Sequence, residues 1–284
     1  MKKVLVTGAN SQLASEIKEL ELNYPRLEFI FADKTEFPLD KKEDIITNFK
    51  KIKPDVVINC AAYTAVDKAE DDTMTADAVN RLGVGILAKL CHESDTQLIH
   101  ISTDYVFDGE SPIPYKEDDI PNPKNAYGLT KLAGEMVCQE NCPNSVVIRT
   151  SWLYSIFGNN FVKTMLRLMS ERDTFGVVND QIGSPTYAGD LAQAIMDIIE
   201  FKTWIGGIYH YSNEGNISWF EFALAIKEIA EETCNIKPID SSSYPTPAKR
   251  PNYSLLDNTK IQEVYGIQTI DYLISLRRMM EKLG

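Results

Sequence analysis

Short runs of apolar, mainly β-branched residues alternate along the chain with longer stretches in which apolar residues recur at helical spacing. The apolar runs are continuous, as expected for strands covered on both faces of a sheet. They predict strands at Lys3–Thr7, Glu28–Ala32, Asp55–Cys60, Gln97–Ser102 and Ser145–Thr150. Helices are predicted between them at Gln12–Leu22, Lys41–Lys51, Met74–His92 and Ala126–Asn141. This alternation predicts an α/β fold with a Rossmann-like, doubly wound parallel sheet.

The pattern loosens after about residue 150. Short strands are predicted at Phe175–Val178 and Ile208–Tyr211, and helices at Phe161–Met169, Leu191–Phe201, Trp219–Glu232 and Tyr272–Leu283. The segment Ser241–Pro251 is rich in Ser and Pro, which is typical of a loop. We therefore predict a Rossmann-like domain over residues 1–150, with its sheet completed by later segments. Residues 151–284 are predicted to form mainly a small α/β lobe that binds the substrate at the carboxyl ends of the strands.

Composition narrows the classes of function. The chain has 41 acidic and 29 basic residues and a net charge of −12, so its surface repels nucleic acids. No apolar run approaches the ~20 residues of a membrane span, and the first apolar run stops at Gly8, too early for a signal peptide. The five cysteines fit no metal-binding spacing and are typical of a reducing cytosol. We expect a cytoplasmic protein with no contact to membranes or nucleic acids and no required metal.

The first predicted strand runs into a candidate phosphate-binding loop, Thr7-Gly8-Ala9-Asn10-Ser11-Gln12-Leu13-Ala14, which is followed by a helix. In dinucleotide-binding folds such a turn aims a helix N-terminus at a pyrophosphate. Gly8 suits the tight turn, whereas Ser11 stands where the backbone must approach phosphate and Ala14 where helix and strand pack. Ser11 either donates a hydrogen bond to the pyrophosphate or crowds it. An ordinary strand–helix turn explains the loop equally well.

Asp33 closes the second predicted strand. A carboxylate at this point accepts hydrogen bonds from the adenosine ribose of a dinucleotide. It also repels the 2′-phosphate of NADPH, while the neighbouring Lys34 attracts that phosphate. We expect both cofactors to be used, with NADH at least as effective as NADPH. An exposed aspartate without function is the alternative.

Two later segments carry candidate catalytic chemistry. Ser102-Thr103-Asp104-Tyr105 ends the fourth predicted strand, and Tyr127 and Lys131 lie four residues apart on one helical face. Tyrosine has a pKa of ~10, and a nearby ammonium is expected to lower it and so make Tyr127 an effective acid–base group. A hydroxyl from Thr103 would complete a site that grips a carbonyl oxygen. Tyr and Lys at this spacing also occur by chance, but their combination with a strand-end Ser-Thr is more specific.

Taken together, these residues resemble the extended short-chain dehydrogenases, and within them the dTDP-4-ketosugar reductases. The resemblance runs nearly end to end, through the blocks Val4–Asn10, Asn59–Glu70, Ile101–Gly109, Arg149–Tyr154, Gly158–Phe161, Asp180–Thr186 and Arg250–Pro251. It implies reduction of the C4 keto group of dTDP-4-dehydro-L-rhamnose to dTDP-L-rhamnose, with NADPH or NADH as cofactor. The enzyme would act as a monomer or homodimer.

The resemblance also implies roles for individual residues. Thr103, Tyr127 and Lys131 would form the catalytic triad, with Tyr127 as the proton donor. The cofactor would contact Gly8, Asn10, Ser11, Gln12, Leu13, Asp33, Asp40, Ala62, Tyr63, Thr64, Tyr127 and Lys131. The nucleotide sugar would contact Thr103, Asp104, Tyr105, Trp152, Asn160 and Arg250.

Some of these residues also have interpretations of their own. Asn160 is predicted to cap the helix that begins at Phe161, and such a helix end suits a diphosphate. Lys163 and Arg250 are candidate cations for the nucleotide. For Trp152, the alternative to substrate binding is a place in the hydrophobic core. At the positions of Ser11 and Ala14 the family usually has glycine.

Two other functions remain open. A nucleotide-sugar epimerase or dehydratase fits the same pattern, although dehydratases usually carry a second acid where this chain has Tyr105. A non-catalytic regulatory subunit like that of methionine adenosyltransferase would suit the altered loop, but it has no need of Tyr127. An assay with NADPH and a 4-ketosugar nucleotide separates the three.

Overall fold

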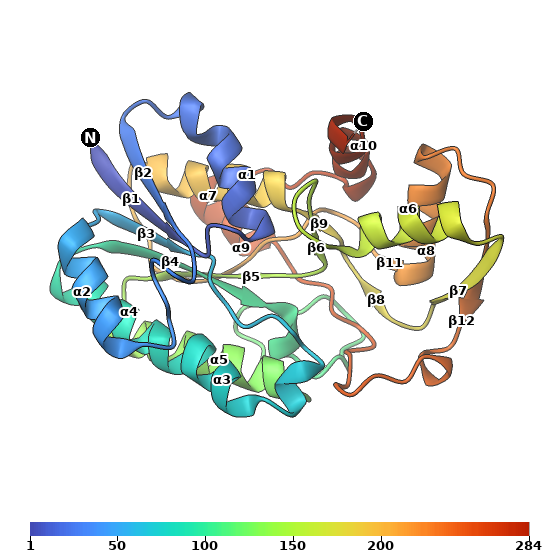
Figure 1. Cartoon of the computed structure of the whole chain (residues 1–284), viewed down its shortest axis with the longest axis horizontal. Helices are drawn as coiled ribbons and strands as arrows, with labels where there is room; N and C mark the ends of the chain where they lie inside the picture. The colour runs from blue at the N-terminus through green and yellow to red at the C-terminus, as the bar shows by residue number, and fades with distance from the viewer. Residues whose placement is uncertain (284) are drawn as a thin grey trace.

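A parallel six-stranded sheet forms the centre of the structure, a computed structural model that describes residues 1–283 (Figure 1). Its strands lie in the order β10-β5-β4-β3-β1-β2, and every neighbouring pair is parallel. They are β1 (Lys2–Thr7), β2 (Leu27–Ala32), β3 (Val56–Asn59), β4 (Gln97–Thr103), β5 (Val146–Thr150) and β10 (Gly207–His210). The strand order reverses between β1 and β3, where ligands bind in doubly wound folds. The predicted fold class is confirmed.

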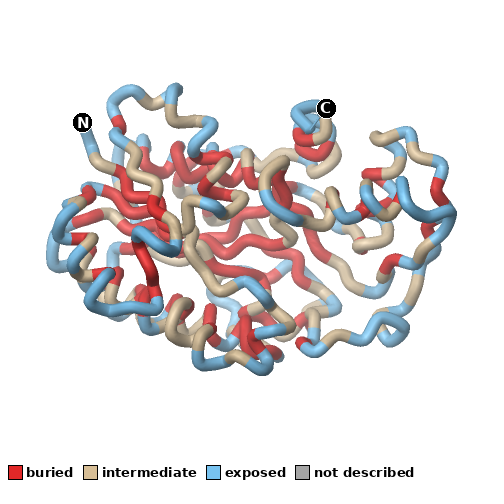
Figure 2. The backbone as a smooth tube through the Cα atoms, viewed as in Figure 1, coloured by how far each residue is buried: buried red, intermediate tan, exposed pale blue. Residues whose placement is uncertain are grey.

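Helices cover both faces of the sheet. On one face lie α1 (Gln12–Leu20), α7 (Ala188–Glu200) and α9 (Thr259–Tyr265); on the other lie α2 (Lys42–Ile52), α4 (Val84–Glu93) and α5 (Ala126–Asn141). Along β1, Val4 and Val6 enter the first core and Leu5 the second, because successive strand residues point to opposite faces. Figure 2 shows the sheet as a buried band between half-exposed helices. Burial on both faces explains why the strands are continuously apolar.

The smaller lobe has a core of its own beyond the carboxyl ends of the strands (Figure 1). It contains α6 (Phe161–Glu171), α8 (Trp219–Ile229) and α10 (Tyr272–Leu283), together with the parallel pair of β7 (Thr174–Val178) and β12 (Asn235–Ile239). Two-residue strands pair β6 (Leu153–Tyr154) with β9 (Thr186–Tyr187), and β8 (Ile182–Gly183) with β11 (Ile217–Ser218). Because α7, β10 and α9 return to the sheet, the chain passes between the two parts more than once. The division at residue 150 remains a prediction.

Several elements differ from the sequence prediction. The helix predicted over Met74–His92 is divided into α3 (Thr73–Asp77), a π-helical segment η3 (Ala78–Gly83) and α4. Gly83 lies against the carbonyl of Leu39, where a Cβ would come within 2.1 Å of the oxygen. The wider π turn also directs Asn80 towards the backbone of Tyr63. The helix at Trp219 ends at Ile229, three residues earlier than predicted.

Short elements are the ones that the hydrophobic pattern does not indicate. They are β12, α9, the two-residue strands and the 3₁₀ turns η1 (Glu21–Asn23), η2 (Lys68–Glu70), η4 (Asp104–Val106) and η5 (Ser241–Ser243). The two-residue strands and the 3₁₀ turns are too short to show either a strand or a helix pattern. Their conformation depends on contacts with distant segments.

Helix α5 is fastened to the sheet by a buried ion pair. Arg149 of β5 donates from Nη2 to Oε2 of Glu135 at 2.7 Å and from Nε to Oε1 at 3.0 Å, and both side chains are 2% exposed. Ser102 of β4 donates to the same carboxylate. A ring nitrogen of His210 in β10 lies 3.4 Å from Nη1 of Arg149. Three adjacent strands therefore hold one helix.

Removing one partner of this ion pair should be far more damaging than removing both. Arg149→Met leaves the Glu135 carboxylate buried without its cation, and we expect unfolding free energy to fall by about 3–5 kcal/mol. The double variant Arg149→Met/Glu135→Leu should recover most of that loss. Urea unfolding followed by circular dichroism measures both. Arg167→Met, which breaks an exposed pair with Glu171, is the control and should cost about 1 kcal/mol or less. A similar small loss for Arg149→Met would contradict the prediction.

Candidate active site

The turn between β1 and α1 has the geometry of a phosphate-binding loop. Gly8 has a φ of 68°, and a Cβ there would lie 2.8 Å from the backbone of Ala61. Only glycine fits this close approach without strain. The tight turn predicted at Gly8 is confirmed, and it places the loop beside the segment that follows β3, which contains Ala62, Tyr63 and Thr64. This narrow backbone cradle fits a dinucleotide.

The first residues of α1 direct polar groups out of the loop. Ser11 is the N-cap of the helix, and its Oγ accepts from the backbone N of Ala14 at 3.2 Å. The hydroxyl proton of Ser11 is thus not needed for the cap and can be donated to a phosphate. The side chain of Leu13 is buried in the hydrophobic core between α1 and the sheet, so only its backbone can face a cofactor. Asn10 donates to Asp33 Oδ2 at 3.4 Å, which joins the loop to the end of β2.

Asp33 is held by the turn that follows it. Its Oδ1 accepts from Thr35 Oγ1 at 2.7 Å and from Thr35 N at 2.8 Å. These hydrogen bonds from Thr35, with a further one from the backbone of Glu36, lower the pKa of Asp33, so it is a carboxylate at neutral pH. Asp40 lies exposed further along, just before α2, and among the described residues its side chain forms no hydrogen bond with the loop.

The catalytic candidates meet at the carboxyl end of β4. Thr103 ends this strand, and Tyr127 lies in the first turn of α5 with its ring edge-on to Tyr105, 5.6 Å between centroids. Gly128 allows this contact, since a Cβ there would lie 2.2 Å from the carbonyl oxygen of Tyr105. Lys131, one turn further, donates from Nζ to the carbonyl oxygen of Ile101 at 2.6 Å. The structure thus brings the three triad candidates together.

Burial dominates the electrostatics of this cluster. It raises the pKa of Tyr127, a hydrogen bond with Thr103 acts in the opposite direction, and the charge of Asp104 raises the pKa further. Burial also lowers the pKa of Lys131 to about 8, against the charge of Glu135. The expected net lowering of the Tyr127 pKa is therefore wrong for this arrangement, because burial raises that pKa. The ammonium is directed at the Ile101 carbonyl, and the loss of hydration outweighs its effect on the phenol.

Asp104 is an acid inside the protein. It is 2% exposed, its Oδ1 accepts from Thr103 Oγ1 at 3.0 Å, and its Oδ2 has no hydrogen-bond partner of good geometry among the described residues. Burial raises the pKa of Asp104 to about 6, and the hydroxyls of Ser254 and Thr103 partly offset that rise. The carboxyl group therefore titrates close to neutral pH.

Arg250 lies at this end of the site and forms an ion pair with Asp67. Its Nη2 donates to Asp67 Oδ2 at 2.6 Å, and Asp67 Oδ1 also accepts from the backbone of Ala248 at 3.1 Å. The charge of Arg250 lowers the pKa of Tyr105, which burial raises. The loop that carries Arg250 is further fastened by Asn125, whose side chain donates to the carbonyl of Lys249 at 2.8 Å.

Asn160 and Trp152 lie at the junction with the lobe. Asn160 Oδ1 accepts from the backbone N of Lys163 at 3.1 Å, so the predicted cap of α6 is confirmed. Its Nδ2 donates to Gln12 Oε1 at 2.9 Å, which ties the lobe to the phosphate loop. Lys163 Nζ donates to the carbonyl of Gly158 at 3.0 Å.

The other junction residue, Trp152, has a φ of 48° and stacks on Trp219, 3.5 Å between centroids. It also packs against the apolar core of the lobe while remaining half-buried. Trp152 therefore contacts the core of the lobe and also has an exposed surface. Its contact with substrate stays a prediction.

Four residues support the site although the sequence analysis assigns them no role: Asp67, Glu70, Asn80 and Asn125. Glu70 and Asn125 accept from the backbone N of Ala126 and Gly128, each at 2.8 Å, and so cap the helix that carries Tyr127. Asn125 stands directly before a predicted helix, which is the sequence signal of an N-cap. The other three act across long stretches of chain and leave no local signal.

Comparison with known proteins agrees with this geometry. Residues 1–284 match the family model described as RmlD substrate binding domain. The chain belongs to this family. The dTDP-4-dehydrorhamnose reductase of Aggregatibacter actinomycetemcomitans is 42% identical over 290 residues, covering 98% of each chain. Crystal structures of the dTDP-4-dehydrorhamnose reductases of Clostridium acetobutylicum and of Bacillus anthracis, the latter in complex with NADP, align with TM-scores of 0.94 at 39% and 38% identity. Each alignment covers 99% of both chains.

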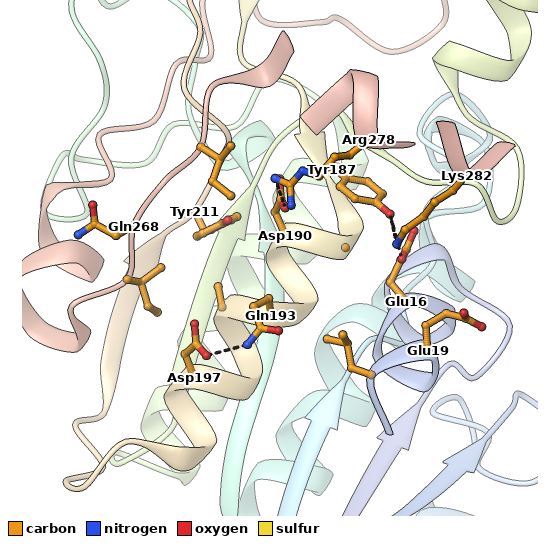
Figure 3. A pocket seen from close by; sticks show the side chains of 15 residues that line it. Glu16, Glu19, Tyr187, Asp190, Gln193, Asp197, Tyr211, Gln268, Arg278 and Lys282 are labelled. Atoms are coloured by element: carbon orange, nitrogen blue, oxygen red, sulfur yellow. Dashed lines mark hydrogen bonds and ion pairs between the residues drawn. The ribbon is translucent and has the colours of Figure 1, made fainter. Parts of the chain in front are cut away.

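This member of the RmlD family also has a polar cavity of about 230 Å³ away from the site, between α1, α7 and α10 (Figure 3). Lys282 donates to the hydroxyl of Tyr187 at 3.2 Å, and Arg278 pairs with Asp190 at the same distance. Burial raises the pKa of Glu16, which accepts from Ser155 at 2.6 Å. These contacts hold α10 against both parts of the chain.

Among residues 1–283, no group of three or more His, Cys, Asp or Glu is placed so that it could hold a metal ion. No helix in the described part of the chain is long and apolar enough to cross a membrane.

Asp104 should make stability depend on pH. Its pKa is raised from 3.8 to about 6, so the folded state binds the proton more tightly and loses stability as pH rises through 6. Asp104→Asn cannot ionise and avoids this loss. We expect its unfolding free energy, relative to the wild type, to increase by about 2 kcal/mol between pH 4 and pH 7. Urea titrations of both proteins across this range are the measurement. A constant difference would show that Asp104 is not the titrating group.

Proposed function

We propose that this chain reduces the C4 keto group of dTDP-4-dehydro-L-rhamnose to the hydroxyl of dTDP-L-rhamnose, with NADH or NADPH as cofactor. The observation that carries the proposal is the buried cluster of Thr103, Tyr127 and Lys131 beside the Gly8 loop. Such a cluster can donate a proton to a carbonyl oxygen in a site that excludes water. The named reductases that share almost the whole length of the chain support the same reaction.

The cofactor would lie along the carboxyl ends of β1 to β4. The cradle at Gly8 and the N-terminus of α1, capped by Ser11, would hold its pyrophosphate. Asp33 would face the adenosine ribose and Lys131 the nicotinamide ribose, and the segment from Ala62 to Thr64 would lie along its side. When bound, the reduced nicotinamide supplies the hydride for the C4 carbon.

Tyr127 is proposed as the proton donor. Reduction of a ketone leaves the C4 oxygen with the electron pair of the carbonyl bond, and this oxygen needs a proton. Because burial raises its pKa, Tyr127 carries the required proton throughout the neutral range. The O–H bond of Tyr127 breaks as the new O–H bond forms on the sugar, and solvent restores the proton afterwards. The ammonium of Lys131 stabilises the phenolate that forms.

The nucleotide sugar would be held between β4, α5 and the lobe, by Asp104, Tyr105, Trp152, Asn160 and Arg250. In this proposal residues 151–284 mainly supply the substrate lobe. An epimerase or dehydratase would keep the same triad, but the residue after Asp104 is Tyr105, which packs on Tyr127 and is no second acid. Cytoplasmic location and assembly as a monomer or homodimer remain predictions.

Tyr127→Phe tests the proton donor. The ring and its packing are retained while the acidic proton is lost, so we expect kcat to fall by about 10²–10⁴-fold. The affinity for NADH should remain, as measured by its fluorescence on binding. Tyr24→Phe, which removes a tyrosine hydroxyl that bonds Gln193 far from the site, is the matched control and should keep full activity. Wild-type turnover in Tyr127→Phe would exclude Tyr127 as the acid.

Asp33→Ala tests the cofactor preference. The carboxylate repels a 2′-phosphate, and two like charges ~4 Å apart interact by ~4 kcal/mol at an effective dielectric of ~20. Lys34 cancels part of this, so we expect the ratio of kcat/KM for NADPH to that for NADH to rise by about tenfold, or 1.4 kcal/mol, in the variant. Asp33→Asn removes the charge and keeps the size of the side chain, so it separates the effect of charge from that of shape. A wild type that strongly prefers NADPH, with no gain in either variant, would show that Asp33 does not face the ribose.

A further inference from the structure

The N-termini of two helices lie side by side where the lobe meets the sheet. Ser11 is the N-cap of α1 and Asn160 is the N-cap of α6. The side chain of Asn160 donates a hydrogen bond to that of Gln12, the first residue of α1, at 2.9 Å. Each helix N-terminus carries roughly half a positive charge, so the two ends repel each other unless anions bind there. The proposed reaction supplies two such anions, the pyrophosphate of the cofactor and the diphosphate of the nucleotide sugar.

The side-chain amide of Asn160 has no proton left for a ligand. An asparagine amide offers two protons and one oxygen. Its Nδ2 donates to Gln12 Oε1 and to the carbonyl of Ser155 at 2.6 Å, with a longer contact of 3.5 Å to the carbonyl of Phe157. Its Oδ1 accepts from the backbone N of Lys163 at 3.1 Å. Because an ionised diphosphate only accepts hydrogen bonds, Asn160 contributes to its binding by placing α6 and not by a bond of its own.

The side chain of Gln12 is committed to the lobe in the same way. Its Oε1 accepts from Asn160, and its Nε2 donates to the carbonyl of Leu153 at 3.4 Å. Gly158 passes close to it with a φ of 62°, and a Cβ there would lie 3.2 Å from Gln12 Cγ. The backbone N–H of Gln12, at the start of a helix, has no partner within that helix. Gln12 therefore faces the lobe with its side chain and leaves its backbone for the cofactor.

One turn further along α1, Glu16 holds the same segment of the lobe at a second point. Residues four apart lie on one face of a helix. Glu16 is buried, its Oε1 accepts from Ser155 Oγ at 2.6 Å, and its Oε2 accepts from the hydroxyl of Tyr187 at 3.3 Å. The segment from Ser155 to Asn160 is thus bonded to α1 at both of its ends. This leaves the N-terminus of α6 little freedom to move away from that of α1.

We propose that Asn160 is a positioning residue: through its hydrogen bond to Gln12 it holds the N-terminus of α6 beside that of α1, so that the two diphosphates bind in one defined relative position. The inference rests on the proposed function. The sugar carries its C4 carbon on one diphosphate, and the cofactor carries its nicotinamide on the other. Their relative placement therefore governs how closely the reacting carbons meet, and a misplacement of about 1 Å costs about 10²-fold in rate.

The first experiment needs no ligand. In ¹⁵N-labelled protein, the side-chain amide signal of Asn160 is assigned by its absence in Asn160→Ser. The proton that Asn160 directs at Gln12 should exchange with solvent about tenfold faster in Gln12→Met, which has a side chain of similar length without the oxygen. Equal exchange rates in the wild type and in Gln12→Met would show that this hydrogen bond does not form, and would overturn the proposal.

The second experiment measures the binding of dTDP by calorimetry without cofactor. Asn160→Ser keeps the cap of α6, because serine caps helices as well as asparagine does, but its hydroxyl is too short to reach Gln12. We expect Asn160→Ser and Gln12→Met each to weaken dTDP binding about fivefold, the size of one hydrogen bond. The double variant should lose no more than either single variant. Thr164→Val removes another hydrogen bond at the same helix end and is the matched control, with unchanged binding.

The third measurement is reduction at saturating NADH. We expect kcat/KM for the nucleotide sugar to fall about 10–100-fold in Asn160→Ser, with kcat lowered as well as KM raised, because the sugar is misplaced as well as more weakly held. Thr164→Val should reduce at the wild-type rate.

Three outcomes would contradict the proposal. Weaker dTDP binding in Asn160→Ser alone would make Asn160 a direct contact of the nucleotide. Additive losses in the double variant would mean that Asn160 and Gln12 act separately. An unchanged kcat in Asn160→Ser would show that the placement of α6 does not affect hydride transfer. If the wild type reduces no 4-ketosugar nucleotide, the proposed function fails, while the exchange and binding measurements still decide the link between Asn160 and Gln12.

Discussion

The buried pair of Glu135 and Arg149 is the constraint on which the rest of the site depends. A helix that only covers a sheet can slide or rotate by a fraction of a turn, since apolar contacts are not directional. Two charged groups in a dry interior permit one geometry, because the cost of burial is offset only when their hydrogen bonds are complete. The ion pair therefore fixes the rotation of α5 about its axis, and with it the face that presents Tyr127 and Lys131.

The same dry interior determines the protonation of the reacting groups. Burial raises the pKa of Tyr127 and of Asp104 and lowers that of Lys131, so each group is shifted towards its neutral form. For a reductase this keeps the phenol protonated until the sugar needs the proton, while the higher pKa makes that proton harder to release. The lysine then remains as the cation that can balance the phenolate. A site open to water would not separate these roles.

The features that could be predicted from the sequence are those that depend on residues close together in the chain. The central strands are buried on both faces, so their apolar character is complete within a few residues. Gly8 has a backbone conformation that favours glycine, and Asn160 has an N-cap position that favours a short polar side chain. The pairing of Arg250 with Asp67 joins segments far apart in the chain and has no local signature. The raised pKa of Tyr127 could not be predicted from residue spacing either. The four-residue interval between Tyr127 and Lys131 shows that they share a helical face, but it does not show how deeply they are buried.

The last strand of the sheet has a consequence for how the protein is made. β10 pairs with β5 along its whole length, from Gly207 with Val146 to His210 with Arg149. On the ribosome, β5 emerges well before its neighbour, and at a translation rate of ~5–20 residues per second it waits roughly several seconds. During that interval the nascent chain has an open parallel edge that can pair with other chains. Translation speed across the lobe, and any chaperone that shields this edge, therefore influence how much enzyme reaches its native state.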